Sequence, residues 1–338
     1  MPAISEDRSP PDLKTLRGAA RLVHESVRPT LQHCWPLLSR ACGCEVWVKH
    51  ENHTPIGAFK VRGGLVYLDA LVRQQPDVSG IVTATSGNHG QSVAFAARRH
   101  GLPVTIVAPE PGAVEKKAAM AALGAEVIEQ GQTFNDAFDH AKALARSTQR
   151  HFMPSFHPLL VRGVASYSLE LLGAVPDLDT VYVPIGLGSG ICGMIHVRDA
   201  LGLKTRIVGV VPAAAPTYAR SFEAGEVLEA AIRPTILDSL INRRAAPLAL
   251  DIIRAGAERI VEVSDDQVIE ALRLYLTATH NLSEPGGAAA LAALYAERAQ
   301  MAGQRVGVVL TGANVDMAAY YRFIAPKAGK ATEATRAF

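Results

Sequence analysis

The chain has 338 residues, of which 49% are hydrophobic and 20% charged, and its formal net charge is +2. This composition is ordinary for a globular enzyme, and the length predicts two lobes rather than one small core. The small net charge gives no electrostatic reason to expect nucleic acid or an anionic membrane as a partner. No apolar run is long enough to span a bilayer, and the polar N-terminus lacks the regions of a signal peptide. We therefore expect a cytoplasmic protein.

The four cysteines do not have the spacing of a zinc site; they are Cys34, Cys42, Cys44 and Cys192. One glycine separates Cys42 from Cys44, and no second pair completes a zinc knuckle. We expect free thiols and no structural metal.

Strand-like and helix-like segments alternate along the chain, which predicts an α/β fold with parallel-rich sheets flanked by helices. The first block is expected to contain strands at 81–84, 104–108 and 127–128 and helices at 89–100, 114–123 and 134–147. Later strands are expected at 181–185, 207–211, 260–263 and 306–310, with a helix at 268–279. We expect residues 80–156 to form a small domain inserted in a large discontinuous domain, 1–79 and 157–338.

Lys60 stands between apolar neighbours, Phe59 and Val61. Because desolvation disfavours the ammonium form, such a lysine can act as a base or form a Schiff base. The alternative is a lysine at a helix edge that extends its charged end into water. The other motifs of the chain favour the first interpretation.

The motif Thr85-Ser86-Gly87-Asn88-His89-Gly90 follows an expected strand and begins an expected helix. Successive backbone N–H groups at a helix start bind anions, and this arrangement suits a carboxylate. A simple helix N-cap formed by Ser86 or Asn88 is the alternative.

The glycine-rich motif at 186–193 also lies between an expected strand and an expected helix. Its glycines allow the backbone to approach a phosphate closely. Gly188, Gly190 and Gly193 satisfy the dinucleotide-binding fingerprint, so an NAD(P)-dependent oxidoreductase is an alternative function. However, the next strand is followed by Pro212 and alanines, without an acidic residue for a ribose, and a single phosphate fits better.

Two further loops carry candidate residues. Thr311 begins Thr-Gly-Ala-Asn at a strand end, where ligands converge in parallel sheets, and its hydroxyl can hydrogen-bond a heterocyclic nitrogen. Glu284 begins Glu-Pro-Gly-Gly before an alanine-rich helix. A helix cap and a turn are the respective alternatives.

In their order along the chain, these motifs resemble the fold-type II pyridoxal-phosphate enzymes, specifically the serine/threonine dehydratase and serine racemase branch. The resemblance covers about residues 29–323, and its most specific motifs are 58–63, 86–90, the glycine-rich loop and 311–314. It implies a two-lobed fold similar to the tryptophan synthase β subunit, pyridoxal 5′-phosphate as cofactor, an amino acid as small-molecule substrate and a homodimer.

The resemblance also implies a role for each motif. Lys60 would hold the cofactor as a Schiff base and remove the α-proton, and Ser86 would act on the opposite face, as in the serine racemases. The implied cofactor contacts are Phe59, Lys60, Asn88, Gly186, Leu187, Gly188, Ser189, Gly190, Glu284 and Thr311. The implied substrate contacts are Thr85, Ser86, Gly87, His89 and Ser239.

The reaction implied is the dehydration of serine, threonine or a bulkier 3-arylserine such as phenylserine to a 2-oxo acid and ammonia. An amino-acid racemase, a β-replacement synthase and a non-catalytic binding protein remain alternatives. Val211 and Thr217 occupy positions at which many relatives carry acidic metal ligands, so we expect no metal. The resemblance ends near Phe323, without the regulatory domain of biosynthetic threonine dehydratases, which favours amino-acid catabolism.

Overall fold

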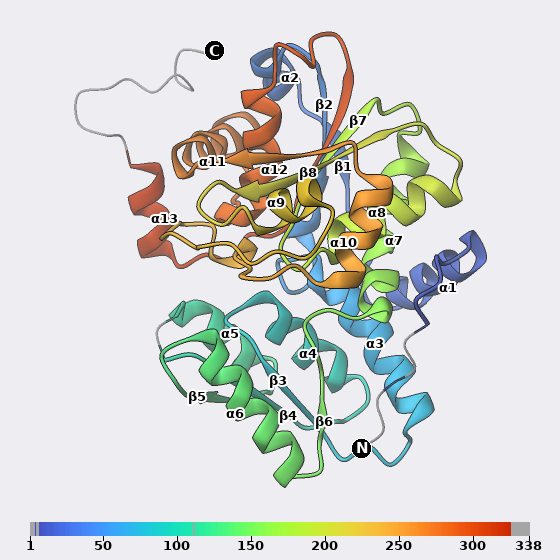
Figure 1. The fold of residues 1–338 in the computed structure, drawn as a ribbon, viewed down its shortest axis with the longest axis vertical. Coiled ribbons are helices and arrows are strands. Elements are labelled where there is room, and N and C mark those ends of the chain that lie inside the picture. The colour runs from blue at the N-terminus through green and yellow to red at the C-terminus, as the bar shows by residue number, and fades with distance from the viewer. Residues whose placement is uncertain (1–3, 5–6, 111, 326–338) are drawn as a thin grey trace. The chain divides into compact units, whose positions relative to one another are not determined.

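The structure is a computed structural model that describes residues 4, 7–110 and 112–325 (Figure 1). The chain forms two compact units. Unit 1 comprises Met1–Arg28 and Thr54–Ser166, and unit 2 comprises Pro29–His53 and Tyr167–Phe338. Each unit contains one sheet, and helix α7 (Pro158–Ala174) carries the chain from unit 1 into unit 2.

The sheet of unit 1 has four parallel strands in the order β5-β4-β3-β6. Their bounds are Glu126–Glu129 (β5), Val104–Ala108 (β4), Ile81–Ala84 (β3) and His151–Phe152 (β6). The two central strands are completely buried, which explains their continuous apolar sequence.

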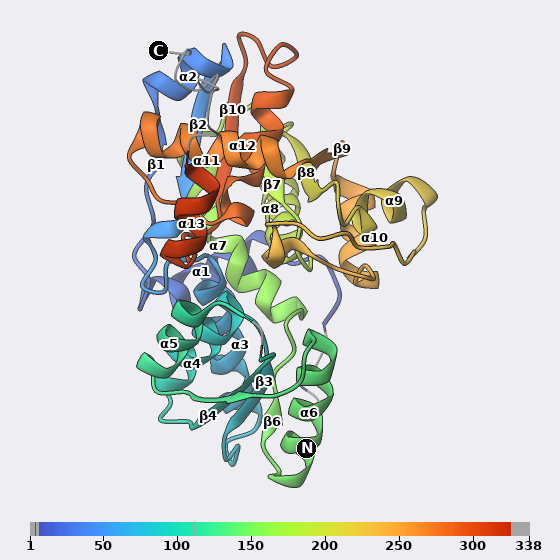
Figure 2. The ribbon, with the colours of Figure 1, turned by 90° about the vertical axis from the view of Figure 1, so that its left-hand side faces the viewer.

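Helices cover both faces of this sheet (Figure 2). Ile81 and Ile106 face a core that includes α3 (Lys60–Gln74), α4 (Asn88–Arg98), Met120 of α5 (Val114–Ala122) and Val23 of α1 (Leu13–His24). Val82 and Val107 face the opposite side and pack against alanines of α6 (Phe134–Ser147). Successive residues of a strand thus serve different cores, as the pleat requires.

The sheet of unit 2 has six strands in the order β1-β2-β10-β7-β8-β9. All neighbouring pairs are parallel except β1 with β2. The strand bounds are Gln32–Cys34 (β1), Glu45–His50 (β2), Arg305–Leu310 (β10), Thr180–Pro184 (β7), Arg206–Pro212 (β8) and Arg259–Val263 (β9).

One face of this sheet packs against a core formed with α2 (Pro36–Cys42), α11 (Asp265–Thr279), α12 (Pro285–Ala296) and α13 (Met317–Ile324). On the other face, Gly209 of β8 leaves space for Ile191 of α8 (Ser189–Ala200). α10 (Pro247–Gly256) packs on α8, and the remaining elements are α9 (Thr217–Ala224) and the short 3-10 helices η1 (Glu51–His53) and η2 (Asp238–Leu240).

The expected elements are confirmed, with their ends shifted by at most a few residues. Strand 81–84, strand 104–108 and helix 134–147 have the predicted bounds. Gly124, with a φ of +91°, follows the C-cap residue Leu123 of α5 in a conformation that suits glycine. The expected free thiols are also confirmed, since all four cysteines are unpaired.

The compact units do not follow the expected domain boundaries. The predicted large domain joins residues 54–79 with 157–338, whereas the structure groups residues 54–79 with 80–166. The reason is α3, because Leu65 and Leu68 are part of the core that α4 and β3 share. The functional division into a large cofactor-binding domain and a smaller inserted domain stays a prediction.

The parallel order brings two motif loops of unit 2 to one edge of its sheet. Val308 of β10 pairs with Tyr182 of β7, so the chain leaves both strands at similar heights, at Leu310 and Pro184. The glycine-rich loop follows β7 and the Thr311 loop follows β10. Ligands of open α/β sheets bind at this carboxyl edge.

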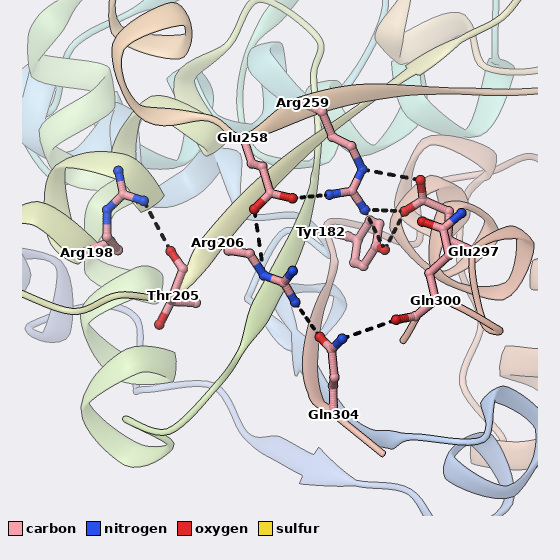
Figure 3. A network of polar contacts seen from close by, with 9 residues as sticks. All are labelled: Tyr182, Arg198, Thr205, Arg206, Glu258, Arg259, Glu297, Gln300 and Gln304. Atoms are coloured by element: carbon pink, nitrogen blue, oxygen red, sulfur yellow. Dashed lines mark hydrogen bonds and ion pairs between the residues drawn. The ribbon is translucent and has the colours of Figure 1, made fainter. Parts of the chain in front are cut away.

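A polar network stabilises the opposite edge of the same sheet (Figure 3). Arg259, at the start of β9, donates to both carboxylate oxygens of Glu297, at 2.5 and 3.3 Å, and Tyr182 donates to the same carboxylate at 2.6 Å. Arg206, at the start of β8, donates to Gln304. The network ties the start of β9 to the end of α12 and the start of β8 to the residue before β10, and thereby supports the strand alignment.

No helix within the described residues is both long and apolar enough to cross a membrane.

Replacing Gly64 by alanine should destabilise the protein. A Cβ at this position would lie 2.3 Å from Ser92 Oγ and 2.9 Å from Ser92 O, and the second atom belongs to the backbone of α4. We expect Gly64→Ala to lower the free energy of unfolding by about 1–3 kcal/mol, measured by urea denaturation. The control is Gly173→Ala, at an exposed helix position with nothing within 4 Å, which should leave stability unchanged or slightly higher. Equal stability of the two variants would contradict the packing argument.

Candidate active site

Lys60 is the first residue of α3, and the preceding turn fixes its backbone. Thr54 Oγ1 accepts a hydrogen bond from Ala58 N at 2.9 Å and donates to Ala58 O at 2.8 Å. Gly57, with a φ of +65°, allows the chain to reverse inside this turn. The turn therefore delivers Phe59 and Lys60 to the helix start in one defined conformation.

Two neighbouring helices hold the first turns of α3. Ser92 of α4 donates from its hydroxyl to the carbonyl oxygen of Lys60 at 2.6 Å. On α7, the carbonyl oxygen of Leu160 lies 2.9 Å from the position of a Cβ on Gly63. Because glycines allow such close approach, Lys60 has a fixed position relative to α4 and to the first part of α7.

The motif at 85–89 lies between β3 and α4, as predicted. Thr85 is buried, and its hydroxyl accepts a hydrogen bond from Gly87 N at 3.1 Å. Asn88 begins α4, and the side chain of Ser86 is exposed. The start of a helix presents backbone N–H groups and the positive end of the helix dipole, so this loop can bind a carboxylate.

His89 is 6% exposed, and its Nε2 atom has no hydrogen-bond partner among the described atoms. Burial, and to a smaller extent the nearby charge of Lys60, lower the pKa of the imidazole to about 3, while a hydrogen bond with the backbone of Met153 acts in the opposite direction. The ring is therefore neutral at neutral pH. It is an uncharged polar group beside Lys60 with one nitrogen available to a ligand.

In unit 2, the glycine-rich loop is tightly confined. Gly188 has a φ of +100°, and a Cβ there would lie 2.8 Å from the Cβ of Ala249. A Cβ on Gly186 would lie 3.0 Å from the carbonyl oxygen of Ser239. Glycine is thus required at 188 both for conformation and for space.

Side chains hold the carbonyl groups of this loop. Asn242 donates to Gly186 O at 2.7 Å, and Tyr218 donates to Leu187 O at 2.9 Å. Burial raises the pKa of Tyr218, so its hydroxyl stays protonated. Since these carbonyl groups are occupied and α8 begins at Ser189, the N–H groups of the helix start are the part of the loop suited to an anion.

The remaining predicted residues of unit 2 adjoin this loop through a series of contacts. The hydroxyl of Ser239 lies 2.2 Å from the position of a Cβ on Gly286, in the turn that begins α12. Glu284, which precedes that turn, donates from its backbone N to the carbonyl oxygen of Gly312 at 3.0 Å. Thr311, next to Gly312, is buried to 7% exposure. Ser239 therefore lies against the glycine-rich loop, and Glu284 and Thr311 are connected to it through Gly286 and Gly312.

The structure thus brings the predicted residues together in two sets. Unit 1 holds Phe59, Lys60, Thr85, Ser86, Gly87, Asn88 and His89; unit 2 holds Gly186, Leu187, Gly188, Ser189, Gly190, Ser239, Glu284 and Thr311. The sequence motifs do not include the residues that support them, Ser92, Tyr218 and Asn242. Of these only Ser92 lies near a motif in sequence, and no local pattern distinguishes the other two.

Both sets fit the cofactor that the resemblance implies. Pyridoxal 5′-phosphate needs an amine for its aldehyde and an anion site for its phosphate. Unit 1 offers the amine of Lys60 beside the unpartnered Nε2 of His89. Unit 2 offers a glycine-rich helix start, and at Gly188 the neighbouring Ala249 leaves no space for a larger side chain.

Comparisons with known proteins agree with this chemistry. Residues 23–312 match the family described as "Pyridoxal-phosphate dependent enzyme". The L-threo-3-hydroxyaspartate ammonia-lyase of Pseudomonas sp is 33% identical over 84% of this chain and 89% of its own length. The phenylserine dehydratase of Ralstonia pickettii is 33% identical over 93% of this chain and 96% of its own. The crystal structure of the T.th. threonine deaminase is 32% identical, covers 91% of this chain and 99% of its own, and has a TM-score of 0.85.

Burial of His89 makes stability depend on pH. The folded pKa is about 3 and the ordinary value is 6.5, so below pH 6.5 the unfolded chain takes up a proton that the folded protein does not. The free energy of unfolding therefore decreases as the pH falls from about 6.5, and this group lowers it by up to about 1.4 kcal/mol per pH unit. His89→Gln should remove that contribution, measured by urea denaturation between pH 6 and 4. Replacement of the exposed His140 is the matched control, and an unchanged slope in His89→Gln would show that His89 binds its proton as readily in the folded protein as in the unfolded chain.

Proposed function

The chain belongs to the family of pyridoxal-phosphate dependent enzymes, and from this premise we propose that it is a dehydratase of β-hydroxy-α-amino acids. The product would be a 2-oxo acid, and ammonia would be released. The proposal rests on an observation in unit 1. Lys60 and the loop at 85–89, which we call the carboxylate loop, begin two helices that are hydrogen-bonded to each other through Ser92. An amine and a carboxylate site in fixed relation are what removal of an α-proton requires.

The residues for the cofactor come from both sets. Pyridoxal phosphate, when bound, withdraws electrons from the α-carbon of an attached amino acid and thereby makes its proton acidic. We assign Lys60 as the residue that holds the cofactor covalently, with Phe59 and Asn88 as its neighbours. We assign the loop at 186–190 to the phosphate, and Glu284 and Thr311 to the ring.

We assign substrate binding and proton removal to residues of the chain itself. The loop at 85–89 binds the carboxylate of the substrate through backbone N–H groups and orients the α-carbon. Lys60, as a free amine, removes the α-proton. Because His89 is neutral, it can contact a ligand without competing with Lys60 for a proton. Ser239, beside Gly186, is assigned to the substrate side chain.

Thr311 supports elimination rather than transamination. Its hydroxyl is neutral, so it provides no counter-charge for a protonated heterocyclic nitrogen, as a carboxylate would. A negative charge that develops at the α-carbon is then less stabilised, and early departure of the β-hydroxyl is favoured. The names of the similar proteins from Pseudomonas and Ralstonia support the same class of reaction.

We also propose that the enzyme is independent of metal. Thr217, at one of the two positions that carry acidic residues in metal-dependent relatives, is 1% exposed and donates to the carbonyl oxygen of Asn242 at 2.5 Å. Asn242 in turn donates to Gly186. This chain of hydrogen bonds ties the segment to the glycine-rich loop without an ion. Over the described ranges, no three His, Cys, Asp or Glu side chains are grouped to hold a metal.

On the basis of the resemblance, we propose that the protein is a homodimer, that it is cytoplasmic and that its substrate is a free amino acid.

Lys60→Ala should strongly reduce the rate of the reaction. We expect ammonia release from a β-hydroxy amino acid to fall by about a hundredfold to ten-thousandfold, because the base is removed. Borohydride should fix the cofactor on Lys60 of the wild type, and peptide mass analysis locates the adduct. The control is Lys142→Ala, on α6, whose ammonium lies over the ring of Phe138 and which should keep full activity.

The substrates for this assay are serine, threonine, 3-hydroxyaspartate and 3-phenylserine, each as both stereoisomers. Chiral analysis of the recovered substrate separates elimination from racemisation, for which the exposed Ser86 is the candidate second acid or base. Undiminished turnover in Lys60→Ala, or racemised substrate without ammonia, would contradict the proposed dehydratase.

Removal of divalent cations should leave ammonia release unchanged. The measurement compares initial rates before and after extended treatment with EDTA, followed by addition of Mg²⁺ or Ca²⁺. A loss of activity that either ion restores would show that a metal site exists despite the hydrogen bonds of Thr217 and Asn242.

A further inference from the structure

The carboxylate loop of unit 1 has a charged neighbour that its motif does not include, Lys116 on α5. The side chain of Lys116 is buried, and the residue is 7% exposed. A Cβ built on Gly87 would lie 3.1 Å from Cδ and 3.7 Å from Nζ of Lys116. The lysine side chain therefore lies along the loop, with its ammonium group beside Gly87.

The packing of α5 explains why this lysine reaches the loop. Met120 is four residues after Lys116, so both side chains lie on one face of α5. A Cβ on Gly90 would lie 2.3 Å from Met120 Sδ. Gly87 and Gly90 thus leave the spaces that Lys116 and Met120 fill, and α5 is held against the first turn of α4.

A bound carboxylate brings a full negative charge to this loop. The backbone N–H groups contribute dipoles but no net charge, and His89 is neutral. Lys60 must itself be neutral to accept a proton. Because a carboxylate that is paired as well as hydrogen-bonded is bound more tightly than one that is only hydrogen-bonded, a cation beside the loop would strengthen binding, and these groups do not provide one. Lys116 carries a positive charge and lies beside Gly87 of this loop.

We propose that Lys116 is a substrate-binding residue whose ammonium group is the counter-charge for the carboxylate of the amino acid. The inference rests on the proposed function, because it takes an α-amino acid as the ligand. It makes the carboxylate, rather than the side chain, the group that Lys116 recognises. Loss of Lys116 should therefore weaken the binding of α-amino acids with different side chains to a similar extent.

The test compares L-alanine with L-alaninamide, which differ in charge at the carboxyl position and carry no β-hydroxyl to eliminate. Dissociation constants are measured by calorimetry on the cofactor-loaded enzyme. In Lys116→Met, which keeps the apolar stem, we expect alanine to bind about 30-fold more weakly than in the wild type and the Kd of alaninamide to change little. Lys116→Arg should restore most of the affinity for alanine.

Lys117→Met is the matched control, because the neighbouring lysine donates to the carbonyl oxygen of Glu110 and pairs with Glu129. It should leave both dissociation constants unchanged. The second readout is steady-state ammonia release, in which Lys116→Met should raise the KM of the substrate much more than it changes kcat.

An unchanged Kd for alanine in Lys116→Met, or an equal loss for alanine and alaninamide, overturns the role of Lys116. An unchanged KM of the substrate in Lys116→Met also overturns the role of Lys116. Ammonia release by the wild type reports separately on the dehydratase, since a wild-type enzyme that binds alanine through Lys116 but releases no ammonia contradicts the reaction alone.

Discussion

The close approach of α3 to α4 is the constraint on which the candidate site of unit 1 depends. Gly64 lets the helices come near enough for Ser92 to donate to the carbonyl oxygen of Lys60. Lys60 begins one helix and Asn88 begins the other, so this contact fixes the amine relative to the carboxylate loop. A side chain at Gly64 would separate the helices and alter the relation between base and substrate, which proton removal tolerates poorly.

Unit 2 positions its loops by a different device. Parallel strands bring the Gly186 and Thr311 loops to the carboxyl edge of one sheet, while the Arg259–Glu297 pair supports the opposite edge. Tyr218 and Asn242 then hold the carbonyl groups of the glycine-rich loop. Anchored carbonyl groups leave the helix start for an anion, which supports the assignment of this loop to the phosphate.

Much of the candidate site could be predicted because its motifs are local. Glycines at strand ends and polar residues at helix starts are visible as short runs, and the structure places each run where the pattern predicted. The supporting residues could not be predicted in this way. Tyr218 and Asn242 contact the glycine-rich loop from about 30 and 55 residues further along the chain, and Lys116 reaches Gly87 from another helix.

The alternation of strands and helices follows from the amino-acid sequence, because periodic burial and turn-forming residues act over a few neighbouring positions. The sequence also indicated Lys60 and two loops as candidates for binding the cofactor and the carboxylate. The packing of α3 with α4 in unit 1, the neutral state of His89 and the buried lysine beside the loop at 85–89 became visible in the three-dimensional structure. These properties depend on burial and on contacts between segments distant in sequence, which no local pattern records.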